Sequence, residues 1–210
     1  GASTAGEGMR AAKISEQKRS AILAAALGEF EANGYRATSM DRIAARARVS
    51  KRTVYNHFAS KQSLFEAIAA ELDERVQHVS DHGYDPAQGL SDQLRDIGKQ
   101  VLDMHAAPCF LTLARVTLVE LIRSPALAQR TYQLFRARQT GLASWLADAA
   151  RDHRLAVDDP VWAADQFIGL LNAFSLWPQI LGGQPVPDDA ERSRILDTTI
   201  QMFLATHGTR

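Results

Sequence analysis

The segment from Arg48 to Lys61, RVSKRTVYNHFASK, combines basic, hydroxyl, amide and aromatic side chains that can bind nucleic acid. Arginine and lysine can donate hydrogen bonds to guanine, asparagine can bond adenine, and tyrosine and threonine can contact thymine methyl groups or phosphates. Val54 and Phe58 lie four positions apart within the segment. This spacing puts both on one face of a helix, so the segment predicts a short helix with an apolar root and a polar outer face.

The polar side chains of this helix can be placed by their angles, at 100° per residue. Arg52 and Asn56 point directly away from the apolar root, Thr53 and Tyr55 lie on its flanks, and Lys51 lies near its N-terminal end. We therefore expect Arg52 and Asn56 to face whatever the helix docks against.

The residues around this helix predict a helix-turn-helix motif. The segment TSMD offers Thr38 as the N-cap of a preceding helix that runs to about Arg46, and Ser50 and Ser60 can cap the two helices that follow. Only ARV separates the two short helices, which is the spacing of a motif whose second helix enters the DNA major groove. The alternative is an amphipathic helix with a solvated, charged outer face.

The charge distribution favours the nucleic-acid interpretation. The chain carries 24 Lys/Arg and 24 Asp/Glu, yet residues 10–61 hold eleven basic and four acidic side chains. This segment has a net charge of +7, so the rest of the chain, with 13 basic and 20 acidic side chains, has a net charge of −7. A polyanion would bind the basic segment.

The whole chain repeats apolar residues at helical spacing and lacks β-branched alternating runs, which predicts an all-α fold of about nine helices. The stripe that ends in Phe30 stops at Asn33-Gly34, and a fourth helix is expected from Ser60 to about His82. Prolines at five positions are each expected to open a later helix, and the last two helices are expected over about 160–181 and 187–206. These prolines are Pro86, Pro108, Pro125, Pro160 and Pro187.

This pattern divides the chain into three parts. Residues 1–10 are interpreted as a disordered leader or an expression scar, because the first Met is Met9. We expect a helix-turn-helix DNA-binding domain over 11–60 and a helical effector-binding and dimerisation domain over 61–210. At 210 residues and 46% hydrophobic content, the chain can form a small head joined to a larger body.

Several other function classes find little support in the sequence. No apolar run approaches the roughly 18 residues of a membrane span, and no signal peptide is evident, so we expect a cytoplasmic protein without membrane contact. There is no Gly-rich phosphate loop, nucleophile elbow, H-E-x-x-H or paired-cysteine motif, so neither an enzyme nor a cofactor nor a metal is expected. The single cysteine, Cys109, could be a redox sensor or a packing residue, and His78, Asp81 and His82 could bind a metal or form a solvated helix end.

The segment from Ile22 to Ile68, ILAAALGEFEANGYRATSMDRIAARARVSKRTVYNHFASKQSLFEAI, resembles the DNA-binding head of the TetR family of transcriptional regulators. The resemblance implies a three-helix head on a helical body that dimerises through its last two helices and holds a small-molecule pocket. It implies base contacts from Lys51, Arg52 and Tyr55, and phosphate contacts from Thr53, Asn56, His57 and Lys61. Asn56 keeps two possible roles, since its outward angle also suits a base contact. Thr38, Arg48 and Ser50 complete the set of expected DNA contacts.

Arg48 departs from the family pattern. The turn usually reads A-G-V-S, and here Arg48 stands in the place of the glycine. If the turn demands a left-handed backbone there, arginine costs about 1 kcal/mol relative to glycine. Either the turn tolerates this residue, or Arg48 also reaches a phosphate.

The C-terminal region offers a candidate dimer surface, because a short recognition helix reads few base pairs and needs a second head. Gly169 and Ala173, four apart, allow close helix approach, and apolar residues surround them. The alternative is an ordinary buried helix. The expected interface residues are Phe167, Gly169, Leu170, Ala173, Phe174, Ile195, Thr199, Met202 and Phe203.

Large aromatic and methionine side chains in the body suit a pocket for a small lipophilic or aromatic effector. The expected effector contacts are Met104, His105, Phe110, Trp145, Phe167 and Trp177, although any one of them could instead be core. Together these features predict a repressor that binds a palindromic operator as a homodimer and is released by the effector. A helical ligand-binding protein with impaired DNA binding and a helical enzyme are the alternatives.

Overall fold

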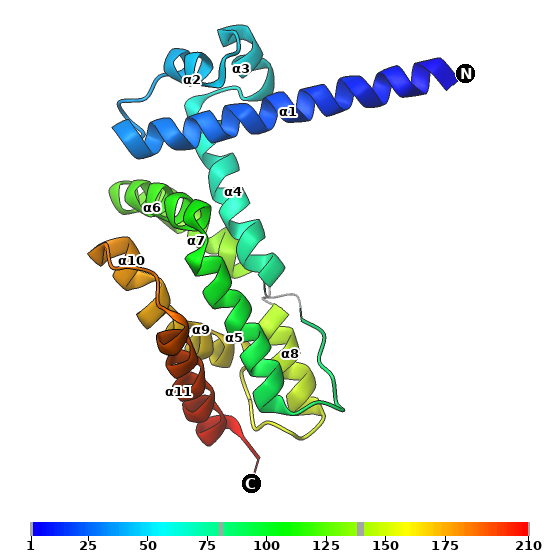
Figure 1. Ribbon diagram of the computed structural model, residues 1–210, viewed down its shortest axis with the longest axis vertical. Coiled ribbons are helices and arrows are strands. Elements are labelled where there is room, and N and C mark those ends of the chain that lie inside the picture. The colour runs from blue at the N-terminus through cyan, green and yellow to red at the C-terminus, as the bar shows by residue number, and fades with distance from the viewer. Residues whose placement is uncertain (1, 80–81, 138–140, 210) are drawn as a thin grey trace. The chain divides into compact units, whose positions relative to one another are not determined.

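The computed structural model describes residues 2–79, 82–137 and 141–209. Within these residues the chain forms eleven α-helices, two more than expected, joined by short turns and loops (Figure 1). They are α1 (Ala2–Asn33), α2 (Met40–Ala47), α3 (Lys51–His57), α4 (Lys61–Val79), α5 (Leu90–Ala106), α6 (Pro108–Arg123), α7 (Pro125–Ala137), α8 (Gly141–Arg151), α9 (Pro160–Ser175), α10 (Trp177–Gly182) and α11 (Asp189–His207).

The chain divides into two compact units. The first comprises residues 1–71 and 115–124, and the second comprises residues 72–114 and 125–210. The division falls within α4, within α6 and directly after α6, whereas the boundary expected between the DNA-binding and effector-binding domains lies between residues 60 and 61. The head thus includes the first half of α4 and the second half of α6.

The first unit is built around α1, against which α2 packs, with α3 packed on α2 (Figure 1). Its core is formed by buried apolar side chains from α1, α2, α3 and the first part of α4. They include Ile22, Ala26, Phe30, Ile43, Val54, Leu64, Phe65 and Ile68. The start of α1 differs from the expected disordered leader, because the helix begins at Ala2 and its side chains from Ala5 to Lys18 are exposed.

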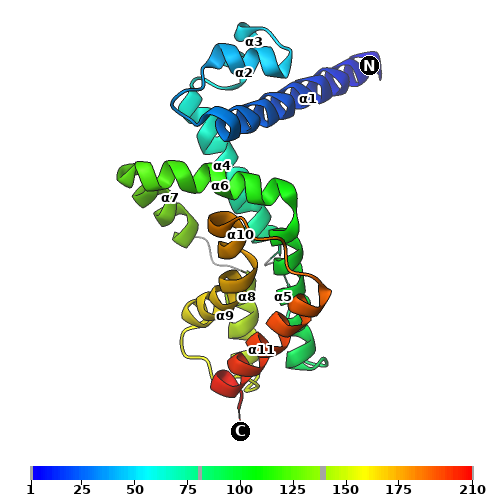
Figure 2. The ribbon, with the colours of Figure 1, turned by 60° about the vertical axis from the view of Figure 1, so that its left-hand side comes forward.

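The second unit has a core of α5, α8, α9 and α11. Helix α5 packs against both α9 and α11, and α8 packs against α9 (Figure 2). The core cluster joins buried side chains from all four helices, among them Leu94, Val101, Leu142, Trp145, Leu146, Phe167, Leu171, Leu196, Ile200 and Phe203. This cluster fixes the faces that α9 and α11 leave exposed.

Three of the five prolines open helices as expected, namely Pro108, Pro125 and Pro160. Pro86 and Pro187 do not, because α5 starts after Gly89, and α11 starts after Asp188, whose side chain forms a capping box with Glu191. Side-chain capping thus determines where α11 starts.

The expected single helix over 160–181 is interrupted. Helix α9 ends at Ser175, Leu176 leaves helical geometry at φ −123° and ψ −62°, and α10 starts at Trp177. Pro178 explains the break, since proline has no N–H to donate and its ring clashes with the carbonyl four residues earlier. The chain therefore turns at Leu176.

No single helix within the described residues is both long and apolar enough to cross a membrane, although α5 and α6 taken together, a bent pair, meet the length and composition test.

Candidate nucleic-acid interface

Serine N-caps determine where α2 and α3, the two helices of the motif, begin. Ser39 is the N-cap of α2 and accepts a hydrogen bond from Arg42 N at 3.2 Å, and Ser50 caps α3 by accepting one from Thr53 N at 3.1 Å. Ser50 is confirmed as a cap, but Ser39, and not Thr38, caps α2. TSMD holds two adjacent candidates, and sequence spacing alone did not separate them.

Thr38 is buried, and its hydroxyl donates to Gly34 O at 2.9 Å and lies 3.2 Å from Glu29 O. The expectation that Thr38 contacts DNA is corrected here, because its polar atom is already used to close the turn after α1. The exposed Ser39 stands in its place at the N-terminus of α2, where backbone N–H groups favour an anion.

Arg48 adopts the left-handed conformation, with φ 56° and ψ 43°. Its backbone N–H donates to Ala45 O at 3.2 Å, and Val49 N donates to Ala44 O at 3.1 Å, so the turn closes the end of α2. The turn thus requires the conformation that favours glycine, and the Arg48 side chain is exposed.

Helix α3 presents the faces that its helical angles predict. Val54 is fully buried and Phe58 is 5% exposed, with the Arg19 guanidinium 5.1 Å from the centre of the Phe58 ring. Arg52 and Asn56 are exposed, and Tyr55 exposes 46% of its surface. Of the remaining expected contacts, Thr53 and His57 are half-buried, and Ser50 and Lys51 are exposed.

Two expected cations already have partners. Lys51 Nζ lies 3.1 Å from Asp41 Oδ1, and the hydrogen bond to Asp41 raises the pKa of Lys51 above its usual value. Lys61 Nζ lies 3.3 Å from Arg36 O and 4.5 Å from the centre of the Tyr35 ring. Burial, followed by the charges of Glu120 and Glu66, raises the pKa of the Tyr35 hydroxyl, so Tyr35 stays neutral beneath the ammonium.

A buried carboxylate ties α2 to α1. Glu29 is 8% exposed, and its oxygens lie 3.4 Å from Arg42 Nε and 3.5 Å from Arg46 Nη1. Asn33 Nδ2 donates to the same carboxylate at 2.8 Å. These contacts join α2, on which α3 packs, to α1. Spacing along the sequence does not reveal this role of Glu29, because its partners lie up to 17 positions away.

The exposed face of α3 therefore projects basic, amide and phenol groups from a helix-turn-helix whose caps, turn and root are all formed. This arrangement can enter a major groove. Comparisons with known proteins agree with it. The family model for bacterial regulatory proteins of the tetR family matches residues 22–68, and the model for the C-terminal domain of AefR-like transcriptional repressors matches residues 92–209.

The chain belongs to the TetR family of transcriptional regulators. A TetR-family regulator from Pseudomonas syringae pv. tomato str. DC3000 is 37% identical and has a TM-score of 0.80, with coverage of 92% of this chain and 98% of that chain. The flavonoid-responsive regulator FrrA is 30% identical at a TM-score of 0.74, with coverage of 93% and 99%. A DNA-binding transcriptional repressor TetR from Mycobacteroides abscessus is 31% identical over 74% of this chain and 90% of its own length.

This TetR-family chain is therefore a DNA-binding transcriptional regulator with an all-α fold. The Mycobacteroides abscessus relative and an HTH-type regulator of Mycobacterium bovis, 26% identical over 89% of this chain, are both named as regulators of transcription.

The body of this TetR-family chain separates the expected dimer residues into two groups. Gly169, Ala173, Phe174 and Met202 are exposed and Leu170 is half-buried, so they form one stripe over α9 and α11. The expected residues Phe167, Ile195, Thr199 and Phe203 are instead between 0% and 8% exposed. The Phe167 and Phe203 rings pack edge to face at 5.4 Å inside a single chain. These four side chains are buried within the single chain, because helical spacing does not tell an inward face from a docking face. Their part in a dimer stays a prediction.

The expected effector contacts lie in different surroundings. Trp145 and Phe167 belong to the core cluster, and Trp145 Nε1 donates to Gln93 Oε1 at 3.0 Å. His105 and Phe110 are buried with ring centres 5.5 Å apart, Met104 is half-buried, and Trp177 is 41% exposed on α10. Trp145 also lines a hollow of about 240 Å³ beside Gln93 and Asp96, and the expected effector contacts stay a prediction.

A hydrogen-bond chain fixes the state of His105. Ser175 Oγ donates to Leu171 O at 2.8 Å and therefore accepts from His105 Nδ1, also at 2.8 Å. Burial lowers the pKa of His105 to about 4, so the ring is neutral at neutral pH. His105 links α5 to the end of α9.

The structure also bears on Cys109 and on the metal site considered for His78, Asp81 and His82. Cys109 is exposed and accepts a hydrogen bond from Arg75 Nη1 at 2.9 Å, so it is not the buried packing residue that one reading of the sequence expected. Within the part of the chain that the structure describes, no three His, Cys, Asp or Glu side chains form a metal site. Asp81, one of the three residues considered as metal ligands, lies outside the described residues.

Proposed function

We propose that this TetR-family chain is a repressor that binds a palindromic operator as a homodimer and is released by a small aromatic effector. The observation that carries the DNA part is the exposed face of α3, with Arg52, Tyr55 and Asn56 projecting from a capped and buried root. We assign Lys51, Arg52 and Tyr55 to bases, and Arg48, Ser50, Thr53, His57 and Lys61 to phosphates. Asn56 faces outward and suits either.

The proposal of a homodimer follows from the limited reach of a seven-residue recognition helix. A helix of this length reads only a few base pairs, so useful specificity requires two heads on related half-sites. The exposed stripe of Gly169, Leu170, Ala173, Phe174 and Met202 supports a docking surface, since Phe174 and Met202 expose 55% and 57% of their surface. Small residues in the stripe allow a second pair of helices to approach closely.

The description of the C-terminal model as that of a repressor and the named repressor of Mycobacteroides abscessus support repression. FrrA is named as responsive to flavonoids, which are flat aromatic molecules, and this supports an effector of similar chemistry. Because α4 runs from the first unit into the second, a ligand that shifted α4 would change the distance between two heads. The ligand shifts this equilibrium only by its differential affinity for the two spacings. The DNA target implies action in the cytoplasm.

A gel-shift titration against the DNA upstream of the protein's own gene tests the DNA part. We expect a shift at low salt that is lost in Arg52→Ala, and retained in Arg151→Ala, which removes a surface arginine from the second unit. If no palindromic duplex is bound at low salt, the proposal is wrong.

Sedimentation velocity tests the dimer. We expect a dimer for the wild type and a monomer for Gly169→Trp, since a large ring would separate the helices. The matched control is Gly8→Trp, because a β-carbon at either glycine meets no atom within 4 Å. A dimer that tolerates Gly169→Trp would place the interface elsewhere.

A further inference from the structure

A hollow of about 240 Å³ lies where α5 and α8 meet the segment that precedes α5. Its lining residues all belong to the second unit, and none of them lies on α9 or α11, the two helices that carry the stripe proposed for dimerisation. Of the six expected effector contacts, only Trp145 lines it. The hollow therefore shares no residue with the proposed dimer surface.

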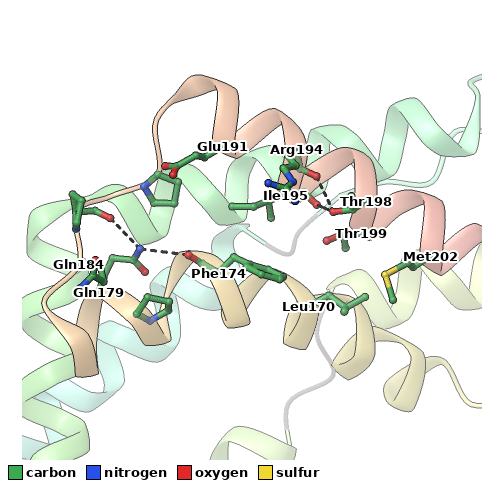
Figure 3. A pocket seen from close by; sticks show the side chains of 13 residues that line it. Leu170, Phe174, Gln179, Gln184, Glu191, Arg194, Ile195, Thr198, Thr199 and Met202 are labelled. Carbon is green, nitrogen blue, oxygen red and sulfur yellow. Dashed lines mark hydrogen bonds between the residues drawn. The ribbon is translucent and has the colours of Figure 1, made fainter.

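A larger hollow is part of that dimer surface instead. Its lining includes Leu170, Phe174 and Met202, which belong to the exposed stripe over α9 and α11 (Figure 3). In the proposed homodimer a second copy of the chain would cover these side chains. The opening between α9, α10 and α11 therefore belongs with the proposed interface and is not assigned to a ligand.

The wall of the smaller hollow is held in place by two polar side chains. Gln93 is 6% exposed, and its Oε1 accepts from Asp85 N and from Trp145 Nε1, both at 3.0 Å. Its Nε2 donates to Asp85 O at 2.8 Å and to Gln88 O at 3.1 Å. Arg154 also donates to Gln88 O, at 2.6 Å. Because contacts within the chain already fix this wall, binding there costs little conformational entropy.

The charged groups of the hollow are acidic. Asp85 and Asp96 both line it, and its lining, all of it within the described residues, includes no lysine or arginine. Asp96 is exposed on α5, and Asp85 is half-buried. Two carboxylates without a cationic neighbour in the lining attract a positive charge. Together with His82, they do not form a three-ligand metal site in the described part of the chain, so an organic cation with N–H donors suits them better.

His82 adds a buried nitrogen to this lining. Its Nε2 is buried and has no hydrogen-bond partner among the residues that the structure describes. In the neutral ring with its proton on Nδ1, Nε2 is an acceptor, and an N–H group brought into the hollow would supply the missing bond. A buried polar atom without a partner is unfavourable, so His82 favours a ligand that carries an N–H donor.

We propose that this hollow binds a small organic amine, whose ammonium groups pair with Asp96 and Asp85 and donate to His82 Nε2. The carbon chain of the amine contacts Ile97 and the Trp145 ring, which supply apolar lining. The volume lies below the roughly 300–1,000 Å³ of pockets for drug-sized ligands, which limits the amine to a short chain. Such an amine differs in chemistry from the proposed aromatic effector, so the site does not depend on the proposed function.

Isothermal titration calorimetry of the full 210-residue chain with 1,4-diaminobutane tests the site. We expect saturable binding of the diamine, and none of 1,4-butanediol, which has the same carbon chain without the ammonium groups. Asp96→Asn should weaken binding of the diamine at least tenfold, because it removes a charge-assisted contact. The matched control is Asp92→Asn, which changes an exposed carboxylate one turn earlier on α5, outside the hollow, and should bind as the wild type does.

Two further variants test the space and the ring nitrogen. Gly83→Phe should abolish binding, because Gly83 lines the hollow and a β-carbon there meets no atom within 4 Å, so an added ring can occupy the free space. Its control is Ala87→Phe, an exposed position in the same segment that does not line the hollow. His82→Phe keeps a ring in place but removes both nitrogens, and it should weaken binding of the diamine severalfold.

Three outcomes would overturn the proposal. The first is absence of saturable binding, and the second is binding that neither Asp96→Asn nor Gly83→Phe changes. The third is displacement of the diamine by an equal concentration of Mg²⁺, which would show diffuse pairing with surface carboxylates. Because operator binding is measured independently by gel shift, failure here is distinguishable from failure of the regulator proposal.

Discussion

Gly98 of α5 and Leu196 of α11 approach so closely that a β-carbon on residue 98 would lie 2.7 Å from Leu196 Cδ2. Phe167 Cζ and Leu171 Cδ1, at 3.6 and 3.8 Å from the same point, close the other sides. Glycine here lets α5 lie directly against α9 and α11. The core of the second unit depends on this approach, since all three helices supply members of its apolar cluster.

Gly98→Ala should lower the free energy of unfolding by about 1 kcal/mol, because overpacking costs about 1–3 kcal/mol and alanine recovers about 1 kcal/mol of helix propensity. Urea denaturation measures it. The control is Gly169→Ala, at a helical glycine with open space around it, which should raise stability by about 0.5–1 kcal/mol. Equal effects from the two variants would contradict the close approach.

Arg48→Gly should raise stability and weaken DNA binding. The left-handed backbone at Arg48 costs an arginine about 1 kcal/mol relative to glycine, so thermal unfolding should shift upward by about 2–4 °C. If the exposed guanidinium reaches a phosphate, the slope of log K against log salt concentration should fall by about 0.9. A higher melting temperature with an unchanged salt slope would show that Arg48 strains the backbone but does not contact a phosphate.

Asp41→Asn should strengthen DNA binding by roughly twofold to tenfold, because it releases Lys51 and removes a negative charge near the phosphates. A double-mutant cycle with Lys51→Gln in gel-shift titrations separates the two effects. The gain should largely disappear when Lys51 is already glutamine. A full gain in that background would show that Asp41 acts by repelling DNA and not through Lys51.

His105 should make the protein less stable in acid. The pKa of His105 is about 4 in the fold, against about 6.5 when unfolded, so between these pH values the unfolded chain binds a proton that the folded chain does not. Stability from this group is therefore present above about pH 6.5 and is lost as the pH falls toward 4, by roughly 3 kcal/mol in all. Urea midpoints from pH 7.5 to 4.5 measure this loss.

The control for this prediction is His105→Gln, which has no charge to gain. It should be less stable at pH 7, since it disturbs the bond to Ser175, but its stability should fall less steeply with acid. Parallel pH curves for the wild type and the variant would assign the acid sensitivity to other groups.

The sequence by itself determined the head to a large extent. A helix-turn-helix is indicated by residues close together in the sequence. Ser50 and Ser60 cap the helices that follow them, and the spacing of Val54 and Phe58 predicts which face of α3 is buried. Each of these features depends on residues within one or two helical turns, so spacing along the chain is sufficient to find it. The prediction that Thr38 caps α2 is wrong, because the turn that follows α1 brings the Thr38 hydroxyl to the carbonyl oxygens of Glu29 and Gly34.

Only the tertiary structure decided which faces of the body are core and which are surface. Phe167 and Phe174 both lie on α9 and have similar sequence context, yet Phe167 is fully buried and Phe174 is 55% exposed. The position of α5 and α11 against α9 makes that difference, and periodicity cannot supply it.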